Sequence, residues 1–255
     1  LHTSFTPGSQ QKVGIVSSLV PKLFEKITTL DSAGKKGVLD AMVKSISQRN
    51  MMMYSDNPAF TNSFLKKYNT YLQLDQLAKP SLFVVDWNWS GNKTNKYVTR
   101  ETNIEVNEAR KQIRVAVTYR NTSKTENYPE GRYRNFQRVF YPTTWRLVEA
   151  AGYPQQMKVY QQAALNYTGQ MVEVPIQGTR SFSLVFEYDN FPSILNLVKQ
   201  AGLESEQVSV QLTLSNSSVI PETFLLKEGF AKNGNIFSKS FLRTTDAAIK
   251  FSENK

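Results

Sequence analysis

The sequence predicts an α+β protein in which an N-terminal helical segment packs on a mainly antiparallel, immunoglobulin-like β-sandwich. Apolar residues recur at helical spacing in residues 1–80, whereas apolar and polar residues alternate in short runs from Ser81 onward. Asn, Gly and Pro separate the alternating runs, which is typical of antiparallel strands joined by turns. We therefore expect a helical segment at 1–80 and a β-sandwich domain at 81–255, and the two could form one packed unit.

Three helices are expected in the first segment. Apolar residues from Val13 to Ile27 predict the first helix, with a kink or break at Pro21. A second helix should begin after a cap at Asp31 or Ser32 and bury one apolar face. A third should open at Asn57, because a proline follows it at the first helical position.

The remaining residues predict strands. Alternating runs mark the strands Ile113–Tyr119, Arg132–Tyr141, Gln170–Ile176, Ser181–Tyr188 and Val208–Leu214. Residues 177–180 contain a glycine, so we expect the third and fourth of these strands to form a hairpin. The segment from Phe191 to Gly202 predicts one inserted helix, with the glycine just past its end.

The composition excludes several kinds of chemistry. The chain of 255 residues has no cysteine and one histidine, His2, at its terminus. Thiolate metal sites and cysteine nucleophiles are therefore excluded, as are serine–histidine triads and histidine-based zinc sites. The segment Ala33–Gly37 approaches a phosphate-binding loop but lacks the leading glycine and the hydroxyl residue after the lysine. We expect no catalytic residues, no metal and no cofactor.

The net charge of +10 favours a partner that is acidic: nucleic acid, anionic lipid or anionic cell-wall polymer. The basic residues are dispersed, so a basic surface without a ligand fits equally well. No segment approaches the roughly 20 apolar residues that span a bilayer, and no signal peptide is present. Because the chain opens on Leu1 rather than Met, we expect a processed or truncated product whose export signal or anchor lay upstream.

A polar loop between two strands supplies the first candidate binding residues, Asp86, Asn88, Asn92 and Lys93. A loop this rich in short hydrogen-bonding side chains is either a demanding turn or a recognition surface. Its carboxylate and amide oxygens could bind calcium. Because only one carboxylate is present, Asx-turn hydrogen bonds are the better interpretation.

A strand with interleaved arginines supplies the second candidates, Arg132, Arg134 and Arg138. On a strand these arginines share one face with Phe136 and Phe140. Arginines beside aromatic rings could stack sugars or bases and hold phosphates. The alternative is that the aromatic rings fill the core. We retain the arginine face as a candidate site for an anionic polymer.

Three parts of the chain match known sequence patterns. Residues 5–12 fit a turn of the form F-x-P-G-S-x-x-K, and residues 85–100 fit V-D-x-N-x-x-x-N-K-x-x-x-Y-V-x-R. Residues 117–121 and 131–142 fit strands of the form Y-R-N and R-V-Y-x-P. In order and spacing these segments resemble a bacterial envelope family catalogued as domain of unknown function four-zero-one-two. Trp87 and Trp89 depart from the pattern, where smaller residues are expected.

The resemblance implies a secreted or membrane-anchored protein with a transmembrane helix near its natural N-terminus. It also implies a preceding domain with a glycine-rich motif, so this chain would be the C-terminal part. The family supplies no catalytic residues. We expect a non-catalytic extracellular module, anchored through a segment outside this chain, for surface assembly, adhesion or binding of anionic wall polymer. The alternative is the accessory part of an envelope glycopolymer-processing enzyme with its active site upstream.

The expected partners follow from the same reasoning. They are other envelope proteins or a second copy of the chain, anionic wall polymer, and the membrane through the missing anchor. Nucleic acid is disfavoured, because the arginine strand lacks the glycines of an RNA-recognition sheet.

Overall fold

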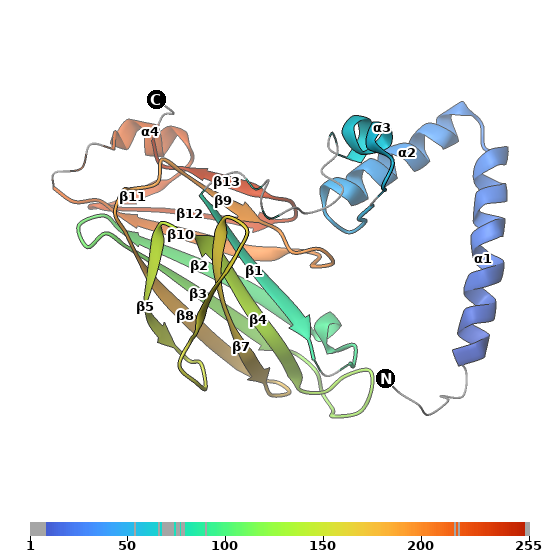
Figure 1. The fold of residues 1–255 in the computed structure, drawn as a ribbon, viewed down its shortest axis with the longest axis horizontal. Helices are drawn as coiled ribbons and strands as arrows, with labels where there is room; N and C mark the ends of the chain where they lie inside the picture. The colour runs from blue at the N-terminus through green and yellow to red at the C-terminus, as the bar shows by residue number, and fades with distance from the viewer. Residues whose placement is uncertain are drawn as a thin grey trace.

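The computed structural model describes residues 9–53, 55–65, 67, 74, 77, 80–89, 91–216, 218 and 220–252. Helices come first along the chain and two β-sheets follow, so the protein is α+β and mostly β. The three N-terminal helices lie to one side of the sheets, and the first of them stands clear of the sheets (Figure 1). The predicted order, a helical segment followed by a β-rich part, is therefore confirmed.

The helices begin where the capping signals predict. Helix α1 (Ser9–Thr29) is continuous through Pro21, so the chain does not break there. A proline removes one intrahelical hydrogen bond, and the turns on either side keep theirs. Helix α2 (Ser32–Ser47) starts after Asp31, whose Oδ1 accepts a hydrogen bond from the Gly34 amide at 2.7 Å. The short helix α3 (Pro58–Phe60) is capped by Asn57, as expected, and a π-helical turn (Thr61–Leu65) follows it.

The first sheet, named sheet A, has the strand order β13–β9–β1–β4–β7–β6. Its strands are β1 (Ser81–Asn88), β4 (Tyr133–Pro142), β6 (Val159–Gln162), β7 (Leu165–Val174), β9 (Ile194–Val198) and β13 (Ala247–Lys250). Strands β1 and β9 run parallel, and the other neighbours in this sheet are antiparallel.

The second sheet, named sheet B, has the order β11–β12–β10–β2–β3–β8–β5. Its strands are β2 (Val98–Asn107), β3 (Gln112–Asn121), β5 (Trp145–Ala151), β8 (Thr179–Tyr188), β10 (Glu206–Thr213), β11 (Ala231–Asn233) and β12 (Ile236–Arg243). Strands β2 and β10 run parallel and the other pairs are antiparallel, so both sheets are mixed. A 3₁₀ turn (Thr94–Tyr97) precedes β2, and helix α4 (Glu222–Lys227) lies between β10 and β11.

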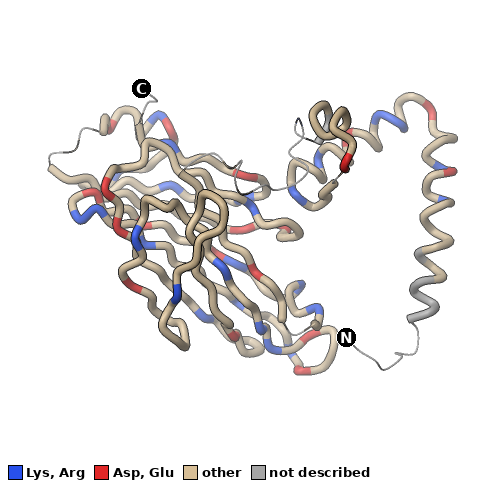
Figure 2. The backbone as a smooth tube through the Cα atoms, viewed as in Figure 1, with Lys and Arg blue, Asp and Glu red and all other residues tan. Residues whose placement is uncertain are grey.

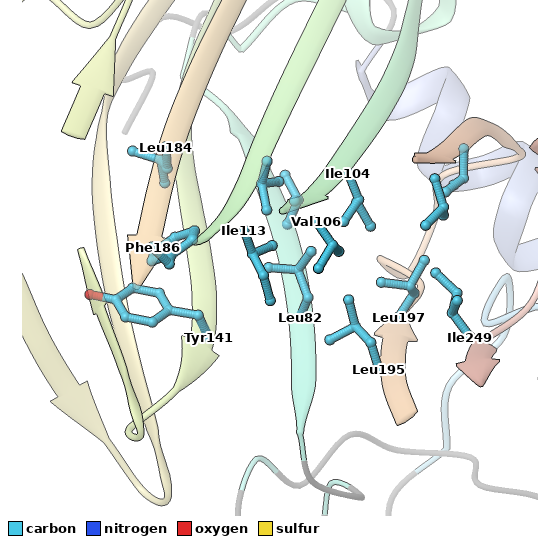
Figure 3. Packing of buried hydrophobic residues seen from close by; sticks show 14 of the residues in the cluster. Leu82, Ile104, Val106, Ile113, Tyr141, Leu184, Phe186, Leu195, Leu197 and Ile249 are labelled. Carbon is cyan, nitrogen blue, oxygen red and sulfur yellow. The ribbon is translucent and has the colours of Figure 1, made fainter. Parts of the chain in front are cut away.

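The hydrophobic core forms between the two sheets. Alternate side chains of each strand point inward, as the period of two requires. Leu82 and Leu195 of sheet A meet Ile104, Ile113 and Phe186 of sheet B, and all five are buried (Figure 3). Burying each such side chain contributes about 1.5–3 kcal/mol, so this layer is the main source of stability.

The predicted hairpin between residues 170 and 188 is wrong. Strand β7 pairs with β4 in sheet A, whereas β8 pairs with β3 in sheet B. The connection bends at Pro175, where the Gly178 amide donates to the proline carbonyl at 3.1 Å, and it carries the chain from one sheet to the other. Alternation is the same in a hairpin and in an arch between sheets, so the pattern could not distinguish them.

The predicted helix at 191–202 is also wrong. Residues Ile194–Val198 form β9, an interior strand between β1 and β13. Its side chains are buried on both faces, Leu195 and Leu197 in the core and Val198 on the outer face of sheet A. A buried strand of this length is a short, mostly apolar run, and periodicity alone does not distinguish such a run from a buried helix.

The helical segment contacts the sheets through the end of α2. Arg49 donates two hydrogen bonds to the Asp246 carboxylate, at 3.0 and 2.6 Å. The buried Lys199 ammonium donates to the Gln48 carbonyl at 2.7 Å. Leu74 and Leu77 of the N-terminal segment also contact an apolar cluster on sheet A. Within the described part of the chain, no helix combines the length and the hydropathy needed to cross a membrane.

Candidate functional site

The layer between the sheets is apolar at one end and polar at the other. On β1 the inward residues change from Leu82 and Val84 to Asp86. On β2 they change from Ile104 to Arg100. The polar side chains of both sheets meet at this end, so the functional candidates here are part of the interior.

Asp86, the first predicted binding residue, is held inside this polar end. Its Oδ2 accepts a hydrogen bond from Arg100 Nη1 at 2.7 Å, and its Oδ1 accepts from Tyr119 Oη at 2.5 Å and from Asn135 Nδ2 at 2.7 Å. The Asp86 side chain is 8% exposed and the Arg100 side chain 1%. Because both carboxylate oxygens already accept hydrogen bonds, they are not available as calcium ligands.

Glu206 extends the same network into sheet B. Its carboxylate accepts hydrogen bonds from Arg100 Nε at 2.8 Å, from Thr102 Oγ1 at 2.5 Å and from Arg243. Burial alone would raise the pKa of Glu206, but the facing guanidinium groups of Arg100 and Arg243 and the Thr102 hydroxyl lower it to about 2. Charges therefore alternate along the row Asp86, Arg100, Glu206 and Arg243, with the first residue in sheet A and the others in sheet B.

The asparagines of the predicted loop mainly fold the loop itself. Asn88 Nδ2 donates to the backbone carbonyl of Asn92 at 3.1 Å, and Asn92 Oδ1 accepts from the Thr94 amide at 3.3 Å, which is an Asx turn. Lys93 is exposed, and its amide donates to the Pro129 carbonyl at 3.1 Å. The structure brings Asp86, Asn88 and Asn92 together and leaves the Lys93 side chain apart from them.

A cleft of about 650 Å³, named the loop cleft, opens beside these residues. The 3₁₀ turn forms one wall, and the turn Gln200–Ser205 forms the other. The lining residues are Asp86, Asn88, Asn92, Asn95, Lys96, Val98, Thr99, Arg100, Tyr119, Tyr133 and residues 200–205. This volume lies in the range of small-molecule sites, about 300–1,000 Å³.

The three predicted arginines lie on the outer face of sheet A. Arg132 donates to Glu126 at 3.0 Å and to Glu173 at 2.9 Å, and Arg134 donates to Glu173 at 2.8 Å. The Arg138 guanidinium carbon lies 5.7 Å from the centre of the Phe136 ring, and no carboxylate among the described residues pairs with it. The predicted sharing of a face is therefore observed, while two of the three charges are already neutralised.

Two exposed tryptophans lie beside these arginines, and sequence reasoning noted them without placing them on this face. Trp87 is 55% exposed and Trp89 60%, and their ring centres are 5.4 Å apart. Across the sheet Trp87 is in register with Phe136, which is in register with Met171. In the next row the Trp89 amide donates to the Arg134 carbonyl. The alternation Phe83, Val85, Trp87, Trp89 on β1 was the signal that could have placed both tryptophans on this face.

The outer face of sheet A has a covered half and an open half. Phe83 and Phe140 stack with ring centres 5.8 Å apart, and Leu74 and Leu77 of the N-terminal segment contact this apolar cluster. The open half is named the Trp–Arg face and consists of Trp87, Trp89, Arg134, Phe136, Arg138 and Met171.

A hollow of about 500 Å³ adjoins the Trp–Arg face. Its lining includes Trp89, Arg134 and Met171, and adds Arg180 from β8. The cations on and around the face are Arg132, Arg134, Arg138 and Arg180, against the two carboxylates of Glu126 and Glu173. Around this face the arginines therefore outnumber the carboxylates. Elsewhere Lys and Arg are spread along the helices and both sheets (Figure 2).

No family model and no curated protein matches the chain. Among solved structures, a protein of Legionella pneumophila provisionally described as nutrient-binding is similar, with 9% identity and a TM-score of 0.34, over 66% of this chain and 69% of that one. Two structures of an M1 zinc metallopeptidase from Deinococcus radiodurans are also similar, each with 9% identity and a TM-score of 0.26. They cover 58% and 57% of this chain and 39% and 38% of the peptidase. Function therefore has to be inferred from the geometry of the chain itself.

Proposed function

We propose that the chain is a non-catalytic binding module of the cell envelope whose Trp–Arg face holds an anionic glycopolymer of the wall. One observation carries this proposal. Cross-strand rows place two exposed tryptophans beside arginines that exceed the neighbouring carboxylates. The side chains stand on three neighbouring strands of a rigid sheet, so the surface is formed before any ligand arrives.

The chemistry of the face suits a polymer that is both sugar-like and anionic. The flat faces of aromatic rings stack against the C–H groups of pyranose rings, and Trp offers the largest such face. Guanidinium groups donate paired hydrogen bonds to phosphate and carboxylate oxygens. Arg138 and Arg180 lack carboxylate partners among the described residues and are therefore the cations that a ligand would meet first.

A polyanion as dense as nucleic acid fits the face less well. Arg132 and Arg134 are each hydrogen-bonded to glutamate, which leaves a surplus of two charges around the face. Nucleic-acid affinity comes mainly from the neutralisation of several phosphates at once. A wall glycopolymer offers fewer charges for each sugar surface and matches the mixture of rings and cations better.

The envelope location belongs to this proposal and rests on the resemblance of residues 85–100 and 131–142 to the bacterial envelope family. We infer an extracellular module, anchored through a segment outside this chain, that works beside other envelope proteins or further copies of itself. We also propose that the two sheets form an immunoglobulin-like sandwich, on the basis of their stacked antiparallel strand pairs.

Retention on purified cell walls tests the proposal. The chain is mixed with walls that carry their anionic glycopolymer and with the same walls after acid extraction of that polymer. We expect retention on the first and not on the second, with release as salt is raised from about 50 to 500 mM. Trp87→Ala combined with Trp89→Ala should reduce retention about tenfold or more, because two stacking contacts are lost together.

Leu242→Ala is the matched control, because Leu242 is also a large exposed apolar residue but lies on sheet B. It should leave retention unchanged. Equal retention of the tryptophan variant and the parent protein would overturn the assignment of the face. Displacement by DNA at lower concentration than by soluble wall polymer would transfer the site to nucleic acid.

A further inference from the structure

The floor of the loop cleft contains a tyrosine hydroxyl that makes no hydrogen bond to a described residue. Tyr133 is 4% exposed and lines the cleft, yet its hydroxyl makes no hydrogen bond with any described residue. Burial and the nearby Asp86 carboxylate raise the pKa of Tyr133, so the hydroxyl keeps its proton and remains a donor. Because this hydroxyl lines the cleft and no described side chain uses it, it can donate a hydrogen bond to an acceptor on a ligand.

A second donor lies beneath the same floor. Arg100 Nη2 is buried and has no hydrogen-bond partner, although Nε and Nη1 of the same guanidinium are bonded. The internal acceptors nearby are already in use, since both oxygens of Asp86 and both of Glu206 accept hydrogen bonds. The floor therefore has unmet donors and no free carboxylate oxygen.

The charged side chains around the floor also favour an anionic ligand. The cations are Arg49, Arg100, Lys199 and Arg243, and the anions are Asp86, Glu206 and Asp246. One positive charge is left over in a partly dehydrated setting. Burial, and after it the neighbouring arginines, lower the pKa of Lys199. On the rim, Lys96 and Glu204 offset one another.

We propose that the loop cleft is a second binding site, separate from the Trp–Arg face, for a small polar molecule that carries a carboxylate or phosphate group. The oxyanion accepts from Tyr133 Oη and lies above Arg100, and the amide side chains at the cleft wall bind the hydroxyl groups of the ligand. A volume of about 650 Å³ accommodates a ligand of one or two sugar rings.

Titration with three sugar probes, followed by isothermal calorimetry and amide NMR shifts, tests this site. The probes are glucuronate, glucose 1-phosphate and glucose, so that the first two distinguish a carboxylate from a phosphate and the third lacks the charge. We expect saturable binding of at least one anionic probe, with shifts at Asn95, Lys96 and residues 200–205, and binding of glucose at least tenfold weaker.

Tyr133→Phe removes only the unpartnered hydroxyl, so it should fold as the parent protein and bind the anionic probe about tenfold or more weakly. The matched control is Tyr141→Phe, because the Tyr141 hydroxyl likewise has no hydrogen-bond partner but does not line the cleft. Lys96→Gln at the rim, an exposed position, should weaken binding severalfold and reduce its salt dependence.

Three results would each overturn the proposal. These are no saturable binding of either anionic probe, equal binding of glucose, or unchanged affinity of the Tyr133→Phe variant. Failure of the cell-wall assay would leave this site untouched, because Trp87 and Trp89 do not line the loop cleft.

Discussion

Replacing Asp86 with asparagine should destabilise the protein by about 3–5 kcal/mol, although the side chain keeps its size. The change leaves the Arg100 guanidinium, 1% exposed, with Glu206 as its remaining carboxylate. It also replaces an acceptor oxygen by an amide nitrogen among donors from Arg100, Tyr119 and Asn135. Arg100 and Arg243 then share Glu206 as the one carboxylate left in the row, so one buried positive charge is uncompensated, and breaking a buried pair on one side typically costs this amount.

Urea unfolding and thermal melts measure the effect. For a domain of this size 1 kcal/mol corresponds to about 2–4 °C, so the Tm should fall by about 6–20 °C. The matched control is Asp40→Asn on helix α2, where the carboxylate pairs with Lys36 at 2.7 Å in an exposed i,i+4 pair. Such a pair contributes about 0.3–0.5 kcal/mol, so the control should melt with the parent protein.

A change of less than about 1 kcal/mol in the Asp86→Asn variant would refute this reasoning. It would mean that the dehydration cost of the pair cancels its attraction. The double variant Asp86→Leu with Arg100→Met separates the causes, because it removes both charges. If the stranded guanidinium causes the loss, the double variant should be more stable than Asp86→Asn, as is common when a buried pair is replaced by apolar residues.

Three further predictions concern pH, docking and packing. The pKa of Glu206 is lowered to about 2 from an ordinary 4.5, so its contribution to stability is complete above pH 4.5. The free energy of unfolding should fall by about 3 kcal/mol as the pH drops toward 2. Urea titrations at several pH values should show this fall, and Glu206→Gln should reduce it. Arg49→Ala removes both hydrogen bonds to Asp246 and should speed hydrogen exchange in α2 while leaving exchange in the sheets unchanged. Gly169→Ala places a Cβ 2.8 Å from the Gln137 carbonyl oxygen in the β4–β7 pair, so it should lower the free energy of unfolding in urea by about 1–3 kcal/mol. Gly14→Ala is the control, because a Cβ there has nothing within 4 Å and should cause no such loss.

The parts of the fold that local signals determine could be predicted. The caps at Asp31 and Asn57 need only a side chain that reaches an amide two or three residues away, and both are formed. The two errors in the sheets arise from information that is not local. The choice between a hairpin and an arch after Pro175, and between a helix and a strand at Ile194–Val198, depends on which distant strand is the neighbour.

In the candidate sites, too, local features could be predicted and contacts between distant residues could not. A period of two was enough to place Arg132, Arg134 and Arg138 on one face. Which glutamates pair with these arginines, and which residues lie beside the tryptophans, depends on the register between strands. A single sequence does not determine that register. Asp86 was recognised as part of a demanding loop, but its role as an internal ion is set by Glu206 and Arg100, which lie 106 residues apart in the chain.

The buried ion network gives the two proposed surfaces a common origin. Along β1 successive side chains point to opposite faces, so Trp87 lies outside, between the inward Asp86 and Asn88. A slip of one residue would place an indole in the ionic layer and a carboxylate among the arginines, and the hydrogen bonds from Arg100, Tyr119 and Asn135 to Asp86 oppose it. The network therefore sets the register on which both the Trp–Arg face and the loop cleft depend. Under conditions where the Asp86→Asn variant is still folded, loss of wall retention and of oxyanion binding together would show this coupling, and loss of neither would contradict it.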